Sequence, residues 1–225
     1  MKLFLFDIDG TLIHSFGAGQ RAADKAFEKM FGIKNVMDGI STDGMTDPLI
    51  LSQMFRKSLG RDYDNFESET FYKEYIICLD QELDCLQKIK ILPGVIKLLK
   101  SLQIRDDCLL GLGTGNIEEG AWIKLKHAGL NSYFSFGGFG SDSENREELI
   151  RIGISKGKEL VNGRSEIKKI FVIGDTPLDI IHGKGAGAVT IATATGRFNI
   201  KELKEYNPDF LLNNLTKINS FNLLS

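Results

Sequence analysis

The chain begins MKLFLFDIDGTLI (residues 1–13), in which a short apolar run ends at two aspartates. The run from Leu3 to Phe6 is too short for a helix and is bounded by a turn signal, so it predicts a fully buried strand. Asp7 and Asp9 follow it, and two like charges at a strand end cost free energy unless a cation or a reacting group offsets them. Ligands bind at the carboxyl ends of strands in open parallel α/β sheets. We therefore interpret Asp7 and Asp9 as part of a functional site.

Short apolar strands alternate with helices in the second half of the chain. The pattern predicts strands at 108–113, 133–138, 170–173, 189–192 and 210–212, and helices at 117–128, 144–161 and 177–184. This alternation is typical of a parallel sheet with both faces covered by helices. The first strand belongs to the same sheet, because a lone strand is not stable. The predicted fold class is therefore α/β, a doubly wound parallel sheet with a Rossmann-like core.

A purely helical block separates the first strand from the rest of the sheet. Apolar residues at helical spacing predict helices at 18–31, 47–59 and 64–86. We expect residues 1–15 and 93–225 to form the catalytic core, and residues 16–92 to form an inserted helical cap. The chain passes between the two near residues 14–17 and 92–94. Two short crossings at adjacent points make a hinge on which the cap can close over the strand ends.

Composition excludes several classes of partner. The 28 basic and 30 acidic residues give a net charge of -2, which argues against nucleic acid. No signal peptide is visible, and no run approaches the ~20 apolar residues of a membrane span, so we expect a cytoplasmic protein with no membrane partner. Cys78, Cys85 and Cys108 form no CxxC pair, which favours free thiols in a reducing compartment. The oligomeric state stays open.

Polar side chains follow three of the predicted strands, and a basic residue begins a predicted helix. Besides Asp7 and Asp9, these are Thr114, Gly115 and Asn116 after the strand at 108–113, Asp175 and Asp179 after the strand at 170–173, and Arg146 near the start of the helix at 144–161. Each segment alone is common in a turn, a helix cap or a solvated surface. In a parallel sheet they all lie on one edge, so their joint occurrence favours a site.

The acids predict metal-assisted phosphoryl chemistry. Asp7, Asp9 and Asp175 together form a hard oxygen cluster that suits Mg²⁺. Asp7, the first residue after the strand, can then attack phosphorus and form an aspartyl-phosphate. Asp9 can donate a proton to the leaving oxygen and later take one from water.

The remaining residues would hold the phosphoryl group. Thr114, Gly115 and Asn116 can bind its oxygens at the start of the next helix. Arg146 can offset the charge of the nucleophile and of the transferring group. Asp179 lies one helical turn beyond Asp175 and can orient the ligands from behind.

At these residues the chain resembles the haloacid dehalogenase superfamily. The DxDGT segment at 7–11 resembles the first motif of that family, Thr114 resembles the hydroxyl of the second, and the segment from Gly174 to Asp179 resembles the fourth. The helical insertion resembles the cap of the phosphoglycolate phosphatase and β-phosphoglucomutase group. The resemblance implies that Asp7, Asp175 and the backbone carbonyl of Asp9 hold Mg²⁺.

The sequence departs from the family pattern at two positions. The third motif is normally a lysine, and here Arg146 is the nearest basic residue before a helix, with Lys156 as the second candidate. Arginine is planar and always charged, so it can neutralise a phosphoryl group without being a simple substitute. His14 stands where relatives commonly have an acid, and we interpret it as a surface or hinge residue.

Asp9 favours a phosphatase over a dehalogenase. An alkoxide is a poor leaving group and must be protonated, whereas carbon–halogen cleavage needs no second acid. We therefore expect a Mg²⁺-dependent phosphatase that acts on a small phosphorylated metabolite, similar to phosphoglycolate phosphatase. We expect the cap residues 39–47, which are polar and glycine-rich, to face a small polar substrate. The alternatives are a phosphomutase of the β-phosphoglucomutase type and a non-catalytic phosphate-binding or switch protein.

Overall fold

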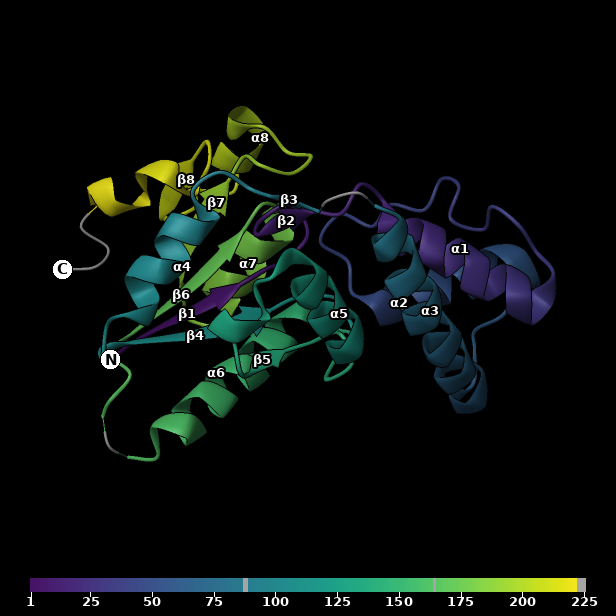
Figure 1. Ribbon diagram of the computed structural model, residues 1–225, viewed down its shortest axis with the longest axis horizontal. Helices are drawn as coiled ribbons and strands as arrows, with labels where there is room; N and C mark the ends of the chain where they lie inside the picture. Colours follow the sequence, from purple (N-terminus) through teal and green to yellow (C-terminus); the bar gives the residue numbers. More distant parts are fainter. Residues whose placement is uncertain (87–88, 164, 222–225) are drawn as a thin grey trace.

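A six-stranded parallel sheet forms the centre of the computed structural model, which describes residues 1–86, 89–163 and 165–221 (Figure 1). Its strand order is β5-β4-β1-β6-β7-β8. The strands are β1 (Lys2–Phe6), β4 (Cys108–Gly113), β5 (Gly137–Gly138), β6 (Lys169–Gly174), β7 (Val189–Thr193) and β8 (Phe210–Leu212). The first strand lies between β4 and β6, so the predicted doubly wound α/β fold is confirmed.

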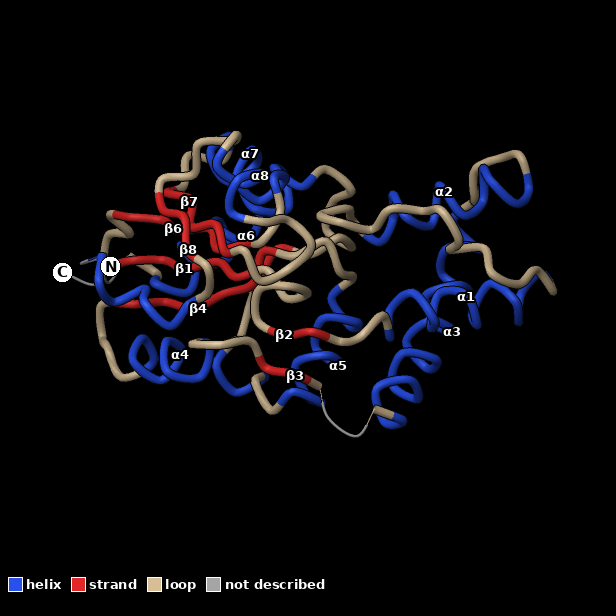
Figure 2. Tube along the Cα trace, turned by 90° about the horizontal axis from the view of Figure 1, so that it is seen from above, coloured by secondary structure: helices blue, strands red, loops and turns tan. Residues whose placement is uncertain are grey.

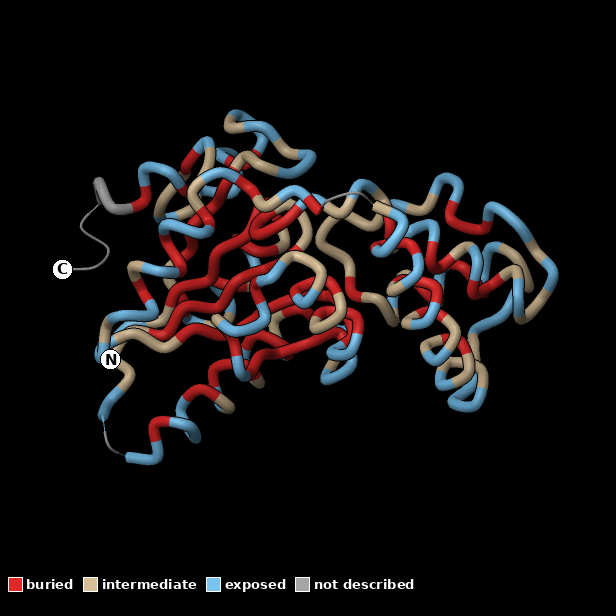
Figure 3. The backbone as a smooth tube through the Cα atoms, viewed as in Figure 1, coloured by how far each residue is buried: buried red, intermediate tan, exposed pale blue. Residues whose placement is uncertain are grey.

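Helices cover both faces of the sheet (Figure 2). On one face Leu3 and Leu5 of β1 pack in a cluster with Leu149 and Ile150 of α6 (Arg146–Val161), beside α7 (Pro177–Gly185). The alternate residues of β1, Phe4 and Phe6, belong to a larger cluster with α4 (Val95–Gln103) and α5 (Glu118–Ala128). Because both faces of the strand are covered, its sequence is continuously apolar. Figure 3 shows the resulting buried layer.

The helices α1 (Ala18–Phe31), α2 (Asp47–Leu59) and α3 (Asn65–Cys85) lie together beyond the carboxyl ends of the strands (Figure 1). Their bounds agree with the predicted ranges to within one residue. The reason is visible at their ends: Asp64 accepts a hydrogen bond from the Glu67 N–H at 2.8 Å in a capping box, and Gly32 and Gly60 end their helices at φ 70° and 69°. The helix α3 also packs on α5.

The two crossings between this helical block and the sheet pair with each other. They form an antiparallel ribbon of β2 (Ile13–His14) and β3 (Lys90–Ile91), in which Ile13 faces Ile91 and His14 faces Lys90. The crossings are therefore neighbours, which is the arrangement that a hinge requires. The division into a core and a mobile cap stays a prediction.

The structure departs from the predicted elements mainly at the edges. The strand expected at 133–138 is reduced to the two residues of β5, and Asn131–Tyr133 forms a short 3-10 helix instead. Among the described residues this edge strand pairs only with β4, and α6 lies directly against it: a Cβ on Gly138 would be 1.7 Å from the Leu149 carbonyl oxygen. The sequence analysis did not predict α4, α8 (Ile200–Lys204) or the 3-10 helix η2 (Leu215–Phe221).

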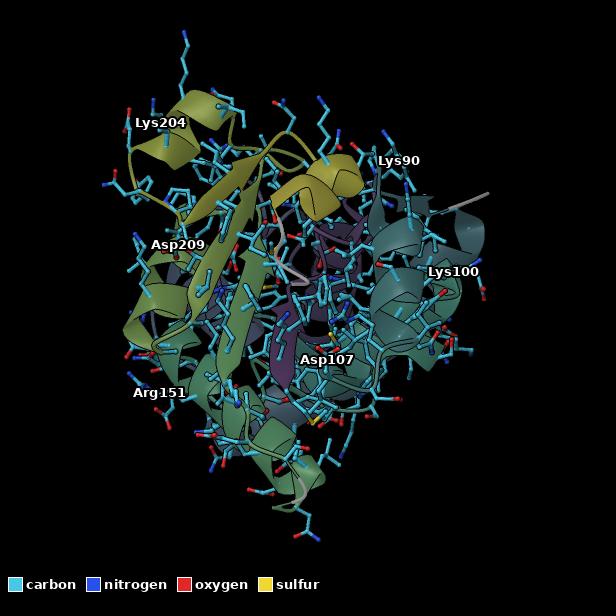
Figure 4. All side chains as sticks on the ribbon, turned by 90° about the vertical axis from the view of Figure 1, so that its left-hand side faces the viewer. Lys90, Lys100, Asp107, Arg151, Lys204 and Asp209 are labelled. Carbon is cyan, nitrogen blue, oxygen red and sulfur yellow. The ribbon has the colours of Figure 1, made fainter. Side chains whose placement is uncertain are left out.

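The end of the sheet where the strands begin carries exposed charges. Asp107 and Asp209, which directly precede β4 and β8, are exposed there (Figure 4). Within the residues that the structure describes, no helix has the length and hydrophobicity that crossing a membrane requires. Cys78, Cys85 and Cys108 are free thiols, but only Cys78 is buried, whereas buried thiols were expected.

Candidate active site

The site is built where β1, β4 and β6 end side by side. Asp7 directly follows β1, and its backbone N–H donates to the Ile173 carbonyl of β6 at 2.9 Å. This bond continues the strand pairing by one residue, so it holds Asp7 beside the segment that carries Asp175. On the other side of β1, the strand β4 leads into Thr114, whose N–H donates to the Gly138 carbonyl. The parallel sheet thus brings together residues more than 160 positions apart.

Three buried carboxylates converge at this edge. One oxygen from each of Asp7, Asp175 and Asp179 lies within 4.8 Å of the others. The predicted metal set was Asp7, Asp9 and Asp175, with Asp179 behind them. The structure places the Asp179 side chain in this cluster and turns the Asp9 side chain elsewhere. Asp179 is also held by Thr176, because its Oδ2 accepts from the Thr176 N–H at 3.0 Å and from the Thr176 hydroxyl at 2.7 Å.

Two glycines make room for Asp175. A Cβ on Gly10 would lie 2.3 Å from Asp175 Oδ2, and one on Gly196 would lie 1.7 Å from the same atom. The hydroxyl of Thr11 donates to Asp175 Oδ1 at 3.0 Å. The glycine and threonine of the DxDGT segment therefore have a structural use: they seat a carboxylate from β6 against the turn that follows β1.

Arg146 joins the carboxylates from the first turn of α6. Its Nη2 lies 2.5 Å from Asp179 Oδ1 and 3.2 Å from Asp7 Oδ1, and its side chain is 4% exposed. Asn145 caps the helix by accepting from the N–H groups of Glu147 and Glu148, which is why α6 begins at Arg146. Lys156, the second candidate, instead pairs with Asp142 at 3.0 Å near the surface. The structure therefore places Arg146, and not Lys156, beside Asp7.

The Asp9 carboxylate lies in a separate polar network. Its Oδ2 accepts from Lys124 Nζ at 2.5 Å and from Asn116 Nδ2 at 3.1 Å, and its Oδ1 accepts from the Ser15 hydroxyl at 3.0 Å. The Asn116 amide also donates to Thr114 Oγ1 at 2.8 Å. Thr114, Asn116 and Asp9 are thus brought together as predicted residues, and Lys124 is added to them.

Lys124 was missed by the sequence analysis, although the sequence holds a signal for it. Its side chain is 5% exposed, and its Nζ also donates to Asn116 Oδ1 at 2.5 Å. In α5 it follows Gly120 by four residues and Ala121 by three, so it stands on the buried face of the helix. A lysine on the buried face of an amphipathic helix requires a charged partner.

Asp47 was expected to start a helix and to belong to the segment 39–47 that faces the site, but not to contact the strand ends as it does. Its Oδ2 accepts from the Ile117 N–H at 2.8 Å, which caps α5 from a distant part of the chain, and its own N–H donates to the Gly115 carbonyl at 2.8 Å. Next to it, the Thr46 hydroxyl donates to the Glu144 carbonyl at 3.1 Å. Nothing in the local sequence indicates these long-range partners.

Burial and the neighbouring charges shift the pKa values of Asp7 and Asp9 in opposite directions. Desolvation raises the pKa of Asp7 to about 7 against the attraction of Arg146, with Asp179 and Asp9 adding to the rise. Burial and the neighbouring Asp7 and Asp179 charges also raise the pKa of Asp175 well above its usual value. Desolvation acts on Asp9 too, but the Lys124 ammonium outweighs it and lowers the pKa of Asp9. The cluster around Asp7 therefore carries repulsion that a divalent cation would relieve.

A cavity of about 470 Å³ opens from these carboxylates into the helical block. It is lined at one end by the predicted residues Asp7, Asp9, Thr114, Gly115, Asn116, Arg146 and Asp175. The segment 42–45 and Asp47 also line it, in agreement with the expectation that residues 39–47 face the site. His14 lines the cavity as well, beside the crossing of the chain into the helical block.

Known proteins resemble this chain over nearly its whole length. The pyrophosphatase PpaX of Listeria monocytogenes serotype 4b (strain CLIP80459) is 27% identical over 217 residues, 95% of this chain and 93% of the relative. The phosphoglycolate phosphatase of Aquifex aeolicus (strain VF5) is 25% identical over 213 residues, 94% of this chain and 92% of the relative. A hydrolase from Pseudomonas syringae has the same fold, with a TM-score of 0.74 at 21% identity over 100% of both chains.

The predicted family is confirmed by a family model. The model described as haloacid dehalogenase-like hydrolase matches residues 4–193, a range that runs from β1 to the end of β7. That range contains all of the carboxylates, Thr114, Lys124 and Arg146. The chain therefore belongs to the haloacid dehalogenase-like hydrolases and is an enzyme of that family.

Proposed function

We propose that this enzyme is a Mg²⁺-dependent phosphatase that hydrolyses a small phosphate monoester through an aspartyl-phosphate on Asp7. One observation carries the proposal: Asp7 is placed at the end of β1 with Arg146 at 3.2 Å and the carboxylates of Asp175 and Asp179 around it, while Asp9 stands two residues further on. A nucleophile, a cation and a second acid at one strand end are the parts that phosphoryl transfer from a monoester requires.

The donor set fits Mg²⁺. The cluster offers only carboxylate oxygens, which are the ligands that Mg²⁺ prefers. The two oxygens of Asp179 accept from Arg146 and Thr176, so Asp7 and Asp175 are the carboxylates proposed to hold the ion, with the backbone carbonyl of Asp9. Bound there, Mg²⁺ would act as a Lewis acid that neutralises the acids and the phosphoryl oxygens.

In the first step an Asp7 oxygen forms a bond to phosphorus as the bond from phosphorus to the ester oxygen breaks. Arg146 offsets the negative charge that would otherwise repel the two reactants. The Thr114 hydroxyl and the Gly115 N–H hold phosphoryl oxygens. Asp9, in its protonated form, gives its proton to the leaving alkoxide.

In the second step water hydrolyses the aspartyl-phosphate. Asp9 accepts a proton from the water as the water oxygen bonds to phosphorus. The bond from phosphorus to the Asp7 oxygen breaks, which restores the Asp7 carboxylate. The low pKa of Asp9 beside Lys124 suits this step, because the base must be ionised when the water arrives. The overall reaction consumes one ester and one water and releases one alcohol and one phosphate.

The proposal is tested with p-nitrophenyl phosphate in the presence of Mg²⁺ or of EDTA. We expect turnover that EDTA abolishes and that Asp7→Asn lowers by at least about a thousandfold, since the variant has no nucleophile. Asp106→Asn, an exposed aspartate, is the matched control and retains activity. Full activity in purified Asp7→Asn would overturn the assignment.

The same protein separates the alternatives. Mass spectrometry of an acid-quenched reaction reports the phosphorylated form. A phosphorylated protein that releases no phosphate would indicate a switch, and transfer to a second hydroxyl of a sugar phosphate would indicate a mutase.

A further inference from the structure

The far end of the cavity has a different chemistry from the end that holds the acids. It is lined by residues of the helical block that α1, α2 and α3 form. The helical block contributes to its lining the apolar or aromatic side chains of Ala23, Met37, Ile50, Leu51, Met54, Phe71, Tyr72 and Tyr75, beside the polar Gln20, Thr42, Asp43 and Asp47. The leaving group of a substrate whose phosphate lies at Asp7 must extend in this direction. Its surroundings there are therefore hydrocarbon and rings, not the polar loop alone.

The volume of the cavity exceeds the needs of a very small substrate. About 470 Å³ lies within the range of roughly 300–1,000 Å³ in which small-molecule sites bury ligands of several rings or a long chain. A two-carbon acid or a second phosphate would leave much of the apolar end in contact with water. Apolar surface that stays hydrated contributes nothing to binding.

The charges that line the cavity leave no cation for an anionic leaving group. Among the described residues, each arginine or lysine in the lining already has a carboxylate partner. Arg146 pairs with Asp7 and Asp179, Lys124 pairs with Asp9, and the Arg197 guanidinium pairs with Asp43. Asp47 adds another carboxylate at the border between the two ends. A carboxylate or phosphate on the leaving group would therefore meet net repulsion.

One polar atom at the apolar end lacks a partner. The Tyr72 hydroxyl is buried and has no hydrogen-bond partner among the described residues. Its ring packs edge-on to Phe71 with the centroids 5.6 Å apart. Because the hydroxyl itself is covered by protein atoms, Tyr72 offers the cavity its ring and not a polar atom.

We propose that the substrate is a phosphate monoester of an uncharged, largely apolar alcohol, whose hydrocarbon or aromatic body fills the pocket formed by α1, α2 and α3. This inference rests on the proposed phosphatase function and narrows its substrate class. It departs from the small polar substrate that residues 39–47 suggest, because those residues line only part of the cavity.

The test compares two esters whose leaving groups are both primary alkoxides, 2-phenylethyl phosphate and ethyl phosphate, and adds 2-phosphoglycolate and pyrophosphate. We expect kcat/KM for the phenylethyl ester to exceed that for each of the others by about tenfold or more, the discrimination that a buried apolar group typically gives. An equal or higher kcat/KM for phosphoglycolate, pyrophosphate or ethyl phosphate would overturn the inference. Absence of turnover with all four and with p-nitrophenyl phosphate would instead overturn the proposed function.

A charge placed in the lining gives an independent test. Ile50 is partly buried and lines the cavity, whereas the neighbouring Leu49 is exposed and does not line it. Ile50→Lys supplies the missing cation, so we expect it to lower kcat/KM for the phenylethyl ester. The ratio of kcat/KM for phosphoglycolate to kcat/KM for the phenylethyl ester should rise by about tenfold. Leu49→Lys, the matched control, leaves the ratio unchanged. Equal ratios in the two variants, with both folded by circular dichroism, would contradict the proposal.

Discussion

Arg146 is the residue on which the charge balance of the site depends most. It is buried between Asp7 and Asp179, and removing it leaves two buried carboxylates without their cation. We expect Arg146→Ala to lower kcat by about a hundredfold to a thousandfold and to lower thermal stability, while Arg146→Lys retains part of the activity because it keeps the charge.

Two neighbours on the same helix serve as controls for that prediction. Arg151 is exposed and pairs with Glu147, and Lys156 pairs with Asp142. Steady-state kinetics of Arg151→Ala and Lys156→Ala should lie within about threefold of the wild type, as surface ion pairs contribute little. A larger loss in Lys156→Ala than in Arg146→Ala would transfer the third-motif role to Lys156.

We expect Lys124 to act on the proposed reaction through Asp9. Because its ammonium lowers the pKa of Asp9, Lys124→Met should raise that pKa and move the acidic limb of the pH–rate profile to higher pH. A merely structural role would lower kcat at all pH values without moving the limb. Lys126→Met, an exposed lysine on the same helix, is the control and leaves the profile in place.

At the scale of elements, the sequence was most informative where local signals coincide with burial. The pattern from Leu3 to Phe6 and the start at Asp47 gave nearly the observed bounds, because strand burial and proline placement are local properties. The predicted length of the edge strand β5 was too great, since its length depends on the close approach of Leu149 from α6. That contact is set by packing, which no local pattern records.

The same reasoning applies to the site. Asp7, Asp175 and Arg146 could be expected together, because parallel strands end at one edge. The orientation of the Asp9 side chain could not, since it depends on Lys124 in a helix more than a hundred residues away. The contacts of Asp47 could not be foreseen for the same reason: its partners, the Ile117 N–H and the Gly115 carbonyl, are about 70 residues away in the sequence.

The contact between α2 and α5 through Asp47 predicts how the stability of the fold depends on pH. Desolvation raises the pKa of Asp47 from 3.8 to about 6. The folded protein therefore binds more protons than the unfolded chain between these values, so the stability from this group falls as pH rises from about 4 to about 6. An asparagine can accept the same Ile117 N–H without the charge.

We therefore expect Asp47→Asn to become more stable relative to the wild type across that interval, by at most about 3 kcal/mol above pH 6. Urea unfolding at pH 4 and pH 7, in EDTA, measures the difference. Asp106→Asn should show no such pH-dependent gain, and a constant difference at both pH values in Asp47→Asn would contradict the assignment.

For the whole molecule, Mg²⁺ should stabilise the fold that assembles its ligands. Asp7 and Asp175 meet only when β1 and β6 are paired, so we expect the ion to bind the folded chain and not the unfolded one. At a hundred times its Kd such a ligand adds about 2.7 kcal/mol, which for a chain of this size raises Tm by about 5–10 °C. Thermal unfolding with and without Mg²⁺ measures the shift. Asp175→Asn should lose it and Asp106→Asn should keep it; an undiminished shift in Asp175→Asn would place the ion elsewhere.

The pairing of Ile13 with Ile91 has a consequence for how such a molecule can change over evolutionary time. The chain enters the helical block after Ile13–His14 and leaves it before Lys90–Ile91, and these two segments are paired neighbours. The helical block is therefore one long insertion at a single point of the core. A tight turn that joins β2 to β3 could replace the insertion, or a different segment could be inserted there, without altering any strand pairing of the sheet. Selection for new substrates could then act on the inserted lobe while the reacting groups stay as they are.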